Sequence, residues 1–232
     1  MFFEEAVDIK YNNFLFIGEA GSGKSEIALN VAVCLKKYSA KQVHFFDLDM
    51  TKPLFRSRDI KEQIEGLGIF FHYEEQFMDA PTLAGGVRKF LMDPECITVI
   101  DVGGDYIGAR SLGGFAPVIN QDQTMVCYVV NSYRPWSRDI GHIDRVLGEI
   151  LGVSHIELER IRLISNPNLG RQTEALDVVM GNEAAVRQIT PYSKITLLCT
   201  EEKLVPEVKE NTSIPVMPLH LYLTYPWEQE AV

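Results

Sequence analysis

The chain has 232 residues and a net charge of −10, with 46% hydrophobic and 23% charged residues. This composition is typical of a globular protein with one large core, and it excludes disorder and a fibrous structure. The acidic charge excludes non-specific DNA binding, which depends on Lys and Arg. The apolar runs are far shorter than the roughly 20 residues of a membrane span. We therefore expect a single domain over residues 1–232, with neither DNA nor a membrane as partner.

The first ten residues carry acids where a secretory signal would carry Lys or Arg. We therefore expect a cytoplasmic protein. The cysteines are far apart and lie within apolar stretches, which predicts buried, reduced thiols. They are Cys34, Cys96, Cys127 and Cys199.

Short segments rich in β-branched and aromatic residues alternate with helical patterns along the chain. The predicted strands are residues 12–18, 42–49, 68–74, 96–102, 124–131, 160–166, 194–200 and 214–219. Their continuous apolar character is typical of strands that are covered on both faces. The alternation predicts an α/β fold, in which three layers (α/β/α) surround a mostly parallel sheet of about seven or eight strands.

Helical periodicity is clearest over residues 25–38. The expected apolar face consists of Ile27, Val31, Cys34, Leu35 and Tyr38. Residues 106–120 are too rich in glycine for one regular helix, so we expect a partly mobile connection there.

Residues 18–25 read GEAGSGKS and match the pattern GxxxxGK[ST] of a phosphate-binding loop. In such a loop backbone N–H groups surround phosphate oxygens, Lys24 reaches the terminal phosphates and the Ser25 hydroxyl binds Mg²⁺. The loop follows a predicted strand and opens a predicted helix, whose N-terminus favours an anion. The residues expected to contact a nucleotide here are Gly18, Glu19, Ala20, Gly21, Ser22, Gly23, Lys24, Ser25 and Glu26.

Carboxylates follow two other predicted strands. Asp47 and Asp49 end one strand, and Asp101 ends another, just before Gly103 and Gly104. At the carboxyl ends of parallel strands these acids would lie beside the loop. We predict a Mg²⁺ site at Ser25, Asp49 and Asp101, with the Gly104 N–H near the γ-phosphate. The alternative for Asp47 and Asp49 is an ordinary solvated turn.

Together these motifs resemble the MinD/ParA/CobQ-like (SIMIBI-class) P-loop superfamily, which includes the nitrogenase iron protein and the Min and Par ATPases. The resemblance covers nearly the whole chain. It is carried by GEAGSGKS at 18–25, DLD at 47–49, DVGG at 101–104 and LISNPNLG at 163–170. The stretches PLFRSRD, DVGGDYIGAR, VVNSYRPW and SNPNLGRQTE are similar to a narrower set of mostly uncharacterised microbial ATP-binding proteins.

The resemblance implies ATP and Mg²⁺ as ligands, often with dimerisation across the nucleotide. It implies that Asn166, followed by Pro167, hydrogen-bonds adenine, and that Asp47 or Asp49 orients the attacking water. Lys24, Asp47 and Asp49 are thus the candidate catalytic residues. For Asn166 the alternative is a residue that caps the next turn.

Glu19 departs from the family pattern, because dimeric Min and Par proteins carry a lysine there that reaches the partner's phosphates. A carboxylate aimed at phosphates is repelled, so we expect Glu19 to face away from them. The candidate arginines for replacing this lysine are Arg110, Arg134, Arg138 and Arg171. An iron–sulfur cluster like that of the nitrogenase iron protein is not expected, because such a cluster uses cysteines in glycine-flanked loops, whereas Cys96 and Cys127 lie at or inside apolar strands.

The leading functional hypothesis is a slow ATPase that acts as a nucleotide-dependent switch or as an accessory or maturation factor for an unidentified partner protein, with a homodimer as the candidate oligomeric state. An alternative is a small-molecule kinase or ATP-dependent synthetase with Arg56, Arg58 and Arg110 lining its substrate cleft. A GTPase is less favoured, because the chain lacks the Asn-Lys-x-Asp set at residues 166–169. A further alternative is an ATP-binding module that does not hydrolyse its ligand.

Overall fold

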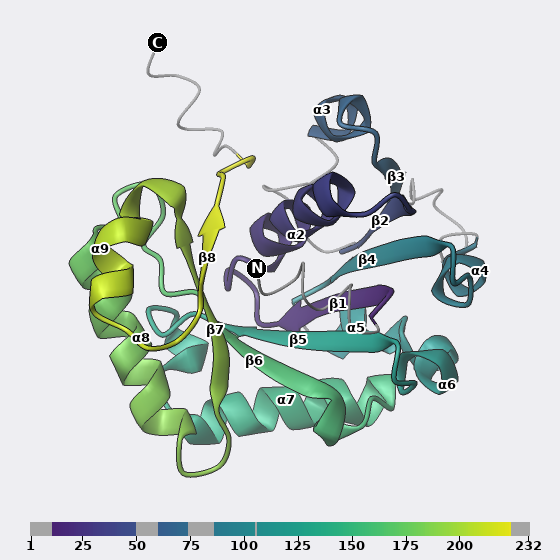
Figure 1. Cartoon of the computed structure of the whole chain (residues 1–232). Helices are drawn as coiled ribbons and strands as arrows, with labels where there is room; N and C mark the ends of the chain where they lie inside the picture. The colour runs from purple at the N-terminus through teal and green to yellow at the C-terminus, as the bar shows by residue number, and fades with distance from the viewer. Residues whose placement is uncertain (1–10, 50–59, 74–85, 105, 224–232) are drawn as a thin grey trace.

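All eight predicted strands form, and they lie side by side in one sheet (Figure 1). The computed structural model describes residues 11–49, 60–73, 86–104 and 106–223. The strands are β1 (Asn13–Gly18), β2 (Gln42–Leu48), β3 (Phe70–Tyr73), β4 (Cys96–Val102), β5 (Thr124–Val130), β6 (Ile161–Ser165), β7 (Ile195–Glu201) and β8 (Val216–Leu219). Their order is β3-β2-β4-β1-β5-β6-β7-β8, and every pairing is parallel. The predicted α/β fold is confirmed.

Helices cover both faces of this sheet (Figure 1). They are α2 (Lys24–Tyr38), α3 (Lys61–Gly66), α4 (Val87–Leu91), α5 (Tyr106–Arg110), α6 (Ala116–Ile119), α7 (Ile140–Ser154), α8 (Ala175–Ile189) and α9 (Val205–Glu210). Helices α2 and α3 pack on one face, and the series from α4 to α8 packs on the other. Three-layer packing follows from this arrangement.

The central strand β1 shows why its apolar run is continuous. Phe14 and Phe16 enter the core beneath α2, whereas Leu15 and Ile17 enter the core on the opposite face, and all four are fully buried. Successive side chains of a strand point to opposite faces, so both faces of β1 need apolar residues.

Helix α2 is more enclosed than its predicted apolar face suggested. Residues 27–33 are all buried, whereas Tyr38 is 66% exposed. The face away from the sheet is covered as well, because Tyr222 and Leu223 pack against the same core. The prediction that Tyr38 belongs to the buried face was wrong, because the last residues of α2 are exposed to solvent.

The glycine-rich segment 106–120 is not one regular helix. In its described part it divides into α5, a 3-10 turn at Gly113–Phe115 and α6. None of the four cysteines, all of which lie in the described part of the chain, forms a disulfide, and Cys34 is only partly buried. Among the described residues, no helix combines the length and the apolar character needed to cross a bilayer.

Candidate functional site

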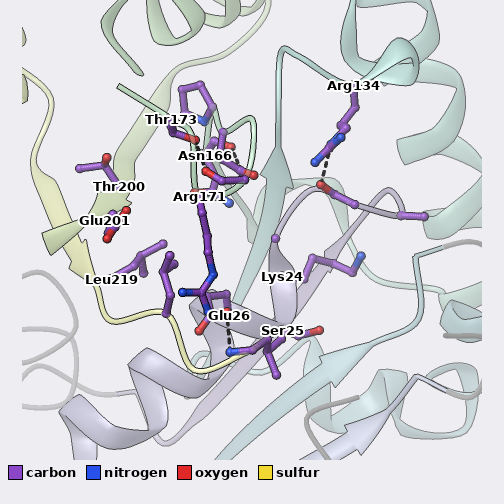
Figure 2. Close-up of a pocket in the computed structure, with 18 of the residues that line it drawn as sticks. Lys24, Ser25, Glu26, Arg134, Asn166, Arg171, Thr173, Thr200, Glu201 and Leu219 are labelled. Carbon is purple, nitrogen blue, oxygen red and sulfur yellow. Dashed lines mark hydrogen bonds between the residues drawn. The ribbon is translucent and has the colours of Figure 1, made fainter. Parts of the chain in front are cut away.

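The loop at residues 18–25 joins β1 to α2, and side chains hold four consecutive carbonyl oxygens of it. Lys24 Nζ donates to the Glu19 oxygen at 2.8 Å, and Trp136 Nε1 donates to that of Ala20 at 3.3 Å. Arg134 Nε donates to the Gly21 oxygen at 3.1 Å (Figure 2), and Asn166 Nδ2 donates to that of Ser22 at 2.8 Å. Carbonyl oxygens repel phosphate. Because side-chain donors bind these four oxygens, the loop is better suited to an anion.

The first turn of α2 adds the groups that a phosphate-binding loop requires. Lys24 and Ser25 are buried there, and the helix begins at Lys24. The N-terminal end of a helix carries a partial positive charge. Together the loop, the lysine and the helix end form an anion-binding arrangement.

The acids at the ends of β2 and β4 converge beside Ser25. Ser25 Oγ donates to Asp101 Oδ2, and Asp101 is fully buried. Asp49 lines the cavity, whereas Asp47 Oδ1 accepts a hydrogen bond from the Asp49 N–H at 3.0 Å and shapes the turn. A hydroxyl with two carboxylates is an oxygen donor set that fits Mg²⁺, which usually completes its shell with phosphate oxygens and water.

The DVGG segment after β4 approaches the loop closely. A Cβ atom at Gly104 would lie 2.6 Å from the Ala20 nitrogen, and one at Gly103 would lie 3.3 Å from Asp49 Oδ1. Only glycine permits this approach of two backbones. The segment is thereby placed at the same end of the cavity as Lys24 and Asp49.

A cavity of about 470 Å³ extends from the loop toward the ends of β6, β7 and β8 (Figure 2). Ligand pockets of this size are common for small molecules. Its walls are formed by Ala20, Gly21, Gly23, Lys24, Ser25, Glu26, Asp49, Gly104, Arg134, Asn166, Pro167, Asn168, Gly170, Arg171, Thr173, Thr200, Glu201, Leu204, Leu219, Leu221 and Leu223. The end with Lys24 is polar, whereas the far wall combines four leucines with Thr200 and Glu201.

Most of the predicted nucleotide-contacting residues line this cavity. The predicted residues outside its lining are Gly18, Glu19, Ser22, Asp47 and Asp101. Of the four candidate arginines, Arg134 and Arg171 line it, whereas Arg110 and Arg138 are exposed elsewhere. Arg56 and Arg58, from the kinase or synthetase hypothesis, lie outside the described residues.

Glu19 points toward α7 instead of into the cavity. Its Oε1 lies 3.4 Å from His142 Nε2, and its side chain is 10% exposed. Burial raises the pKa of this carboxyl to about 7, against the opposing effects of Lys24 and Arg145. The position agrees with the expectation that Glu19 faces away from the phosphates.

Sequence reasoning missed the far wall of the cavity. Thr200 and Glu201 stand at the carboxyl end of β7, so the rule that ligands bind at strand ends could have found them. The leucines at 219, 221 and 223 carry no local signal, because only the tertiary fold brings them to the cavity.

The sequence matches no protein-family model and no curated protein. The fold is similar to that of chloroplast FtsY from Physcomitrella patens, with a TM-score of 0.51, 15% identity, and coverage of 82% of this chain and 58% of that chain. It is also similar to the signal recognition particle receptor FtsY from Elizabethkingia anophelis in complex with GDP, with a TM-score of 0.53, 14% identity, and coverage of 84% and 58%. A second structure of that receptor gives a TM-score of 0.52 with 14% identity, 87% of this chain and 65% of that one.

This chain therefore spans less than two thirds of the FtsY chains that it matches. At these identities the likeness concerns the fold alone. The narrower resemblance to the MinD/ParA/CobQ group stays a prediction. The eight-stranded parallel sheet, its flanking helices and the likeness to FtsY show that this chain has an α/β fold of the P-loop NTPase type.

Proposed function

We propose that this protein is a nucleotide-dependent switch that binds ATP with Mg²⁺, hydrolyses it slowly and acts on a partner protein in the cytoplasm. The observation that carries the proposal is one cavity that joins the GEAGSGKS loop, Asp49, Gly104 and Asn166. The FtsY structure solved in complex with GDP supports a nucleotide as the ligand class.

The phosphates would lie against the loop and Lys24. The cation would be held by Ser25 Oγ together with Asp101 and Asp49, and it would neutralise charge on the phosphates. Lys24, now bonded to the Glu19 carbonyl, is within the same cavity and can donate to a phosphate oxygen instead. Asp49 is the acid that we assign to orienting the attacking water, since it lines the cavity and Asp47 does not.

Gly104 would contact the γ-phosphate and change position when that phosphate is lost. Its backbone packs against Ala20 of the loop, so a phosphate bound at the loop lies within reach of the DVGG segment. Loss of that phosphate would release the segment, which is how nucleotide switches change conformation. A partner protein or a second copy of the chain would bind one of the two conformations in preference to the other.

Asn166 favours adenine as the base. An Asn amide pairs with adenine by donating to N7 and accepting from the N6 amine. Asn166 Nδ2 carries two hydrogens and uses one for Ser22, so the second is available for N7.

Guanine is the second candidate base, because Glu201 favours it. This carboxylate lines the cavity, held at 2.9 Å from Lys203 Nζ, and a carboxylate can accept from N1 and N2 of guanine. The FtsY structure with GDP points in the same direction.

The test is the binding of ATP, ADP and GTP with and without Mg²⁺, measured by calorimetry on the wild type and on Lys24→Ala. The matched control is Lys37→Ala, at the exposed end of the same helix. We expect Lys24→Ala to weaken ATP binding by about 100-fold or more, as a lost charge-assisted contact to phosphate requires. Equal binding by the wild type and Lys24→Ala would refute the proposed site. If the wild type binds GTP more tightly than ATP, and Glu201→Gln removes this preference, the base is guanine.

A further inference from the structure

The last residue of β8 and the residues after it pass over the beginning of α2 and line the cavity. We name residues 219–223 the C-terminal strap. Its alternate residues Leu219, Leu221 and Leu223 line the cavity at the end away from Lys24 (Figure 2 labels Leu219). Alternate residues of an extended chain share one face, so the strap presents an apolar surface to whatever occupies that end.

Two residues of α2, one turn apart, hold the strap. The Glu26 carboxylate accepts from the Tyr222 N–H at 2.5 Å and from the Leu223 N–H at 3.2 Å. Asn30 pairs with both backbone groups of His220, since its Nδ2 donates to the oxygen and its Oδ1 accepts from the nitrogen, each at 2.8 Å. Asn30 Nδ2 also donates to the Glu26 carbonyl oxygen at 2.8 Å, so the anchors are joined.

Glu26 follows Ser25 directly, in the first turn of α2. Its carboxylate is partly buried in the first turn of a helix whose N-terminus would receive phosphate. A negative charge there opposes phosphate binding. Arg171, which reaches toward Glu26 from the loop before α8 (Figure 2), offsets part of this charge. The positive end of the helix favours an acid in this turn, and the two strap N–H groups account for the direction in which its carboxylate points.

We infer that Glu26 is a positioning residue that ties the strap to the helix of the phosphate-binding loop, so that the strap leucines form the wall against the base and ribose of a bound nucleotide. This inference rests on the proposed function. It assigns the two ends of the ligand to different parts of the chain: Lys24 and Ser25 bind phosphates, and Glu26 acts on the nucleoside through the strap.

The assignment predicts different effects on ATP and on inorganic tripolyphosphate, two ligands that share the chain of three phosphates. Inorganic tripolyphosphate carries the phosphates but has no nucleoside. Because Glu26 acts through the strap, its loss should weaken ATP binding and leave tripolyphosphate binding unchanged or slightly tighter, since a nearby negative charge is removed.

The experiment compares ATP and tripolyphosphate, each with Mg²⁺, on Glu26→Gln, Leu221→Ala and the control Glu183→Ala, an exposed acid on α8. The change Leu221→Ala removes part of the wall and leaves both anchors intact. For Glu26→Gln and Leu221→Ala we expect about tenfold weaker ATP binding and a change below about twofold for tripolyphosphate. Hydrogen exchange of residues 219–223 should be faster in Glu26→Gln and unchanged in Leu221→Ala.

Equal losses for ATP and tripolyphosphate, or no loss for ATP, would overturn the inference. If Glu26→Gln does not fold, Asn30→Ala takes its place, because it removes only the His220 pair on the strap side. Failure of the proposed function looks different: the wild type would then bind neither ligand, or Lys24→Ala would bind both as the wild type does.

Discussion

The backbone of Gly23 lies directly against the side-chain amide of Asn166. A Cβ atom at residue 23 would collide with Asn166 Nδ2, the atom that donates to the Ser22 oxygen at 2.8 Å. Gly23 also has a φ of 91°, in the left-handed region. The contact joins the loop after β1 to the end of β6, so it aligns the phosphate end of the cavity with the end expected to hold the base.

Gly23→Ala should therefore damage both the loop and the cavity. A left-handed conformation costs a residue with a Cβ about 1–2 kcal/mol, and displacement of Asn166 adds to that cost. We expect the free energy of unfolding to fall by about 2 kcal/mol and ATP binding to be lost. Urea denaturation and calorimetry measure the two effects.

Gly148→Ala is the matched control. Gly148 is exposed on α7, and an added Cβ has nothing within 4 Å. This change should stabilise the protein by about 0.5–1 kcal/mol, because alanine favours a helix. Comparable losses in both variants would contradict the role given to Gly23.

Arg134 is the arginine whose removal should weaken the binding of the nucleotide phosphates. It lines the cavity and donates to Gly21 of the loop at 3.1 Å, whereas Arg138 in the same connection is exposed and outside the cavity. We expect Arg134→Ala to weaken ATP binding about tenfold, the size of one charged hydrogen bond, and Arg138→Ala to leave it unchanged. Titration with a fluorescent ATP analogue measures both. An equal effect of the two changes would show that only net charge matters.

Glu19 should make the protein less stable as pH rises. Its folded pKa is about 7, above the ordinary 4.5, mainly because the carboxyl is buried. The protonated group contributes stability that is complete below pH 4.5 and is lost as pH rises through 7. Relative to the wild type, Glu19→Gln should gain on the order of 2 kcal/mol between pH 5 and pH 8, since one pKa unit is about 1.4 kcal/mol. Urea unfolding at pH 5 and pH 8 tests this. If the variant and the wild type differ in free energy of unfolding by the same amount at both pH values, the prediction is wrong.

His44 should have the opposite pH dependence. Burial, and secondarily His72, lowers its pKa to about 4, against the effect of Asp93. Its Nδ1 lies 2.9 Å from His72 Nε2, and its ring stacks on Phe90 with centroids 3.9 Å apart. A lowered pKa means that stability is present above pH 6.5 and is lost as pH falls through 4.

His44→Phe keeps the stacked ring and removes the titrating group. We expect the variant to lose about 1–2 kcal/mol less stability than the wild type between pH 6.5 and pH 4.5. Denaturation followed by circular dichroism at these pH values measures the difference. Parallel pH profiles of variant and wild type would assign the acid sensitivity to other groups.

The strands and the loop could be read from the sequence because their signals are local. Continuous apolar runs such as residues 96–102 need only a neighbour on each face, and GEAGSGKS needs only its glycines, Lys24 and Ser25. The acids were found because parallel strands end at a common edge, which brings Asp49 and Asp101 toward Ser25. The separate roles of Asp47 and Asp49 were not visible, because alternate residues of a strand share one face, and only the structure shows that β2 ends between them and that the Asp47 side chain binds the Asp49 N–H.

By itself, the sequence determined the α/β class, the eight strands and the phosphate-binding loop, since each depends on neighbouring residues. The tertiary structure alone decided which arginines reach the cavity, that Glu19 contacts α7, and that the strap leucines form the far wall. These contacts join residues more than 100 positions apart, such as Glu26 and Tyr222. Strand order and helix packing create them, and no local pattern encodes that order.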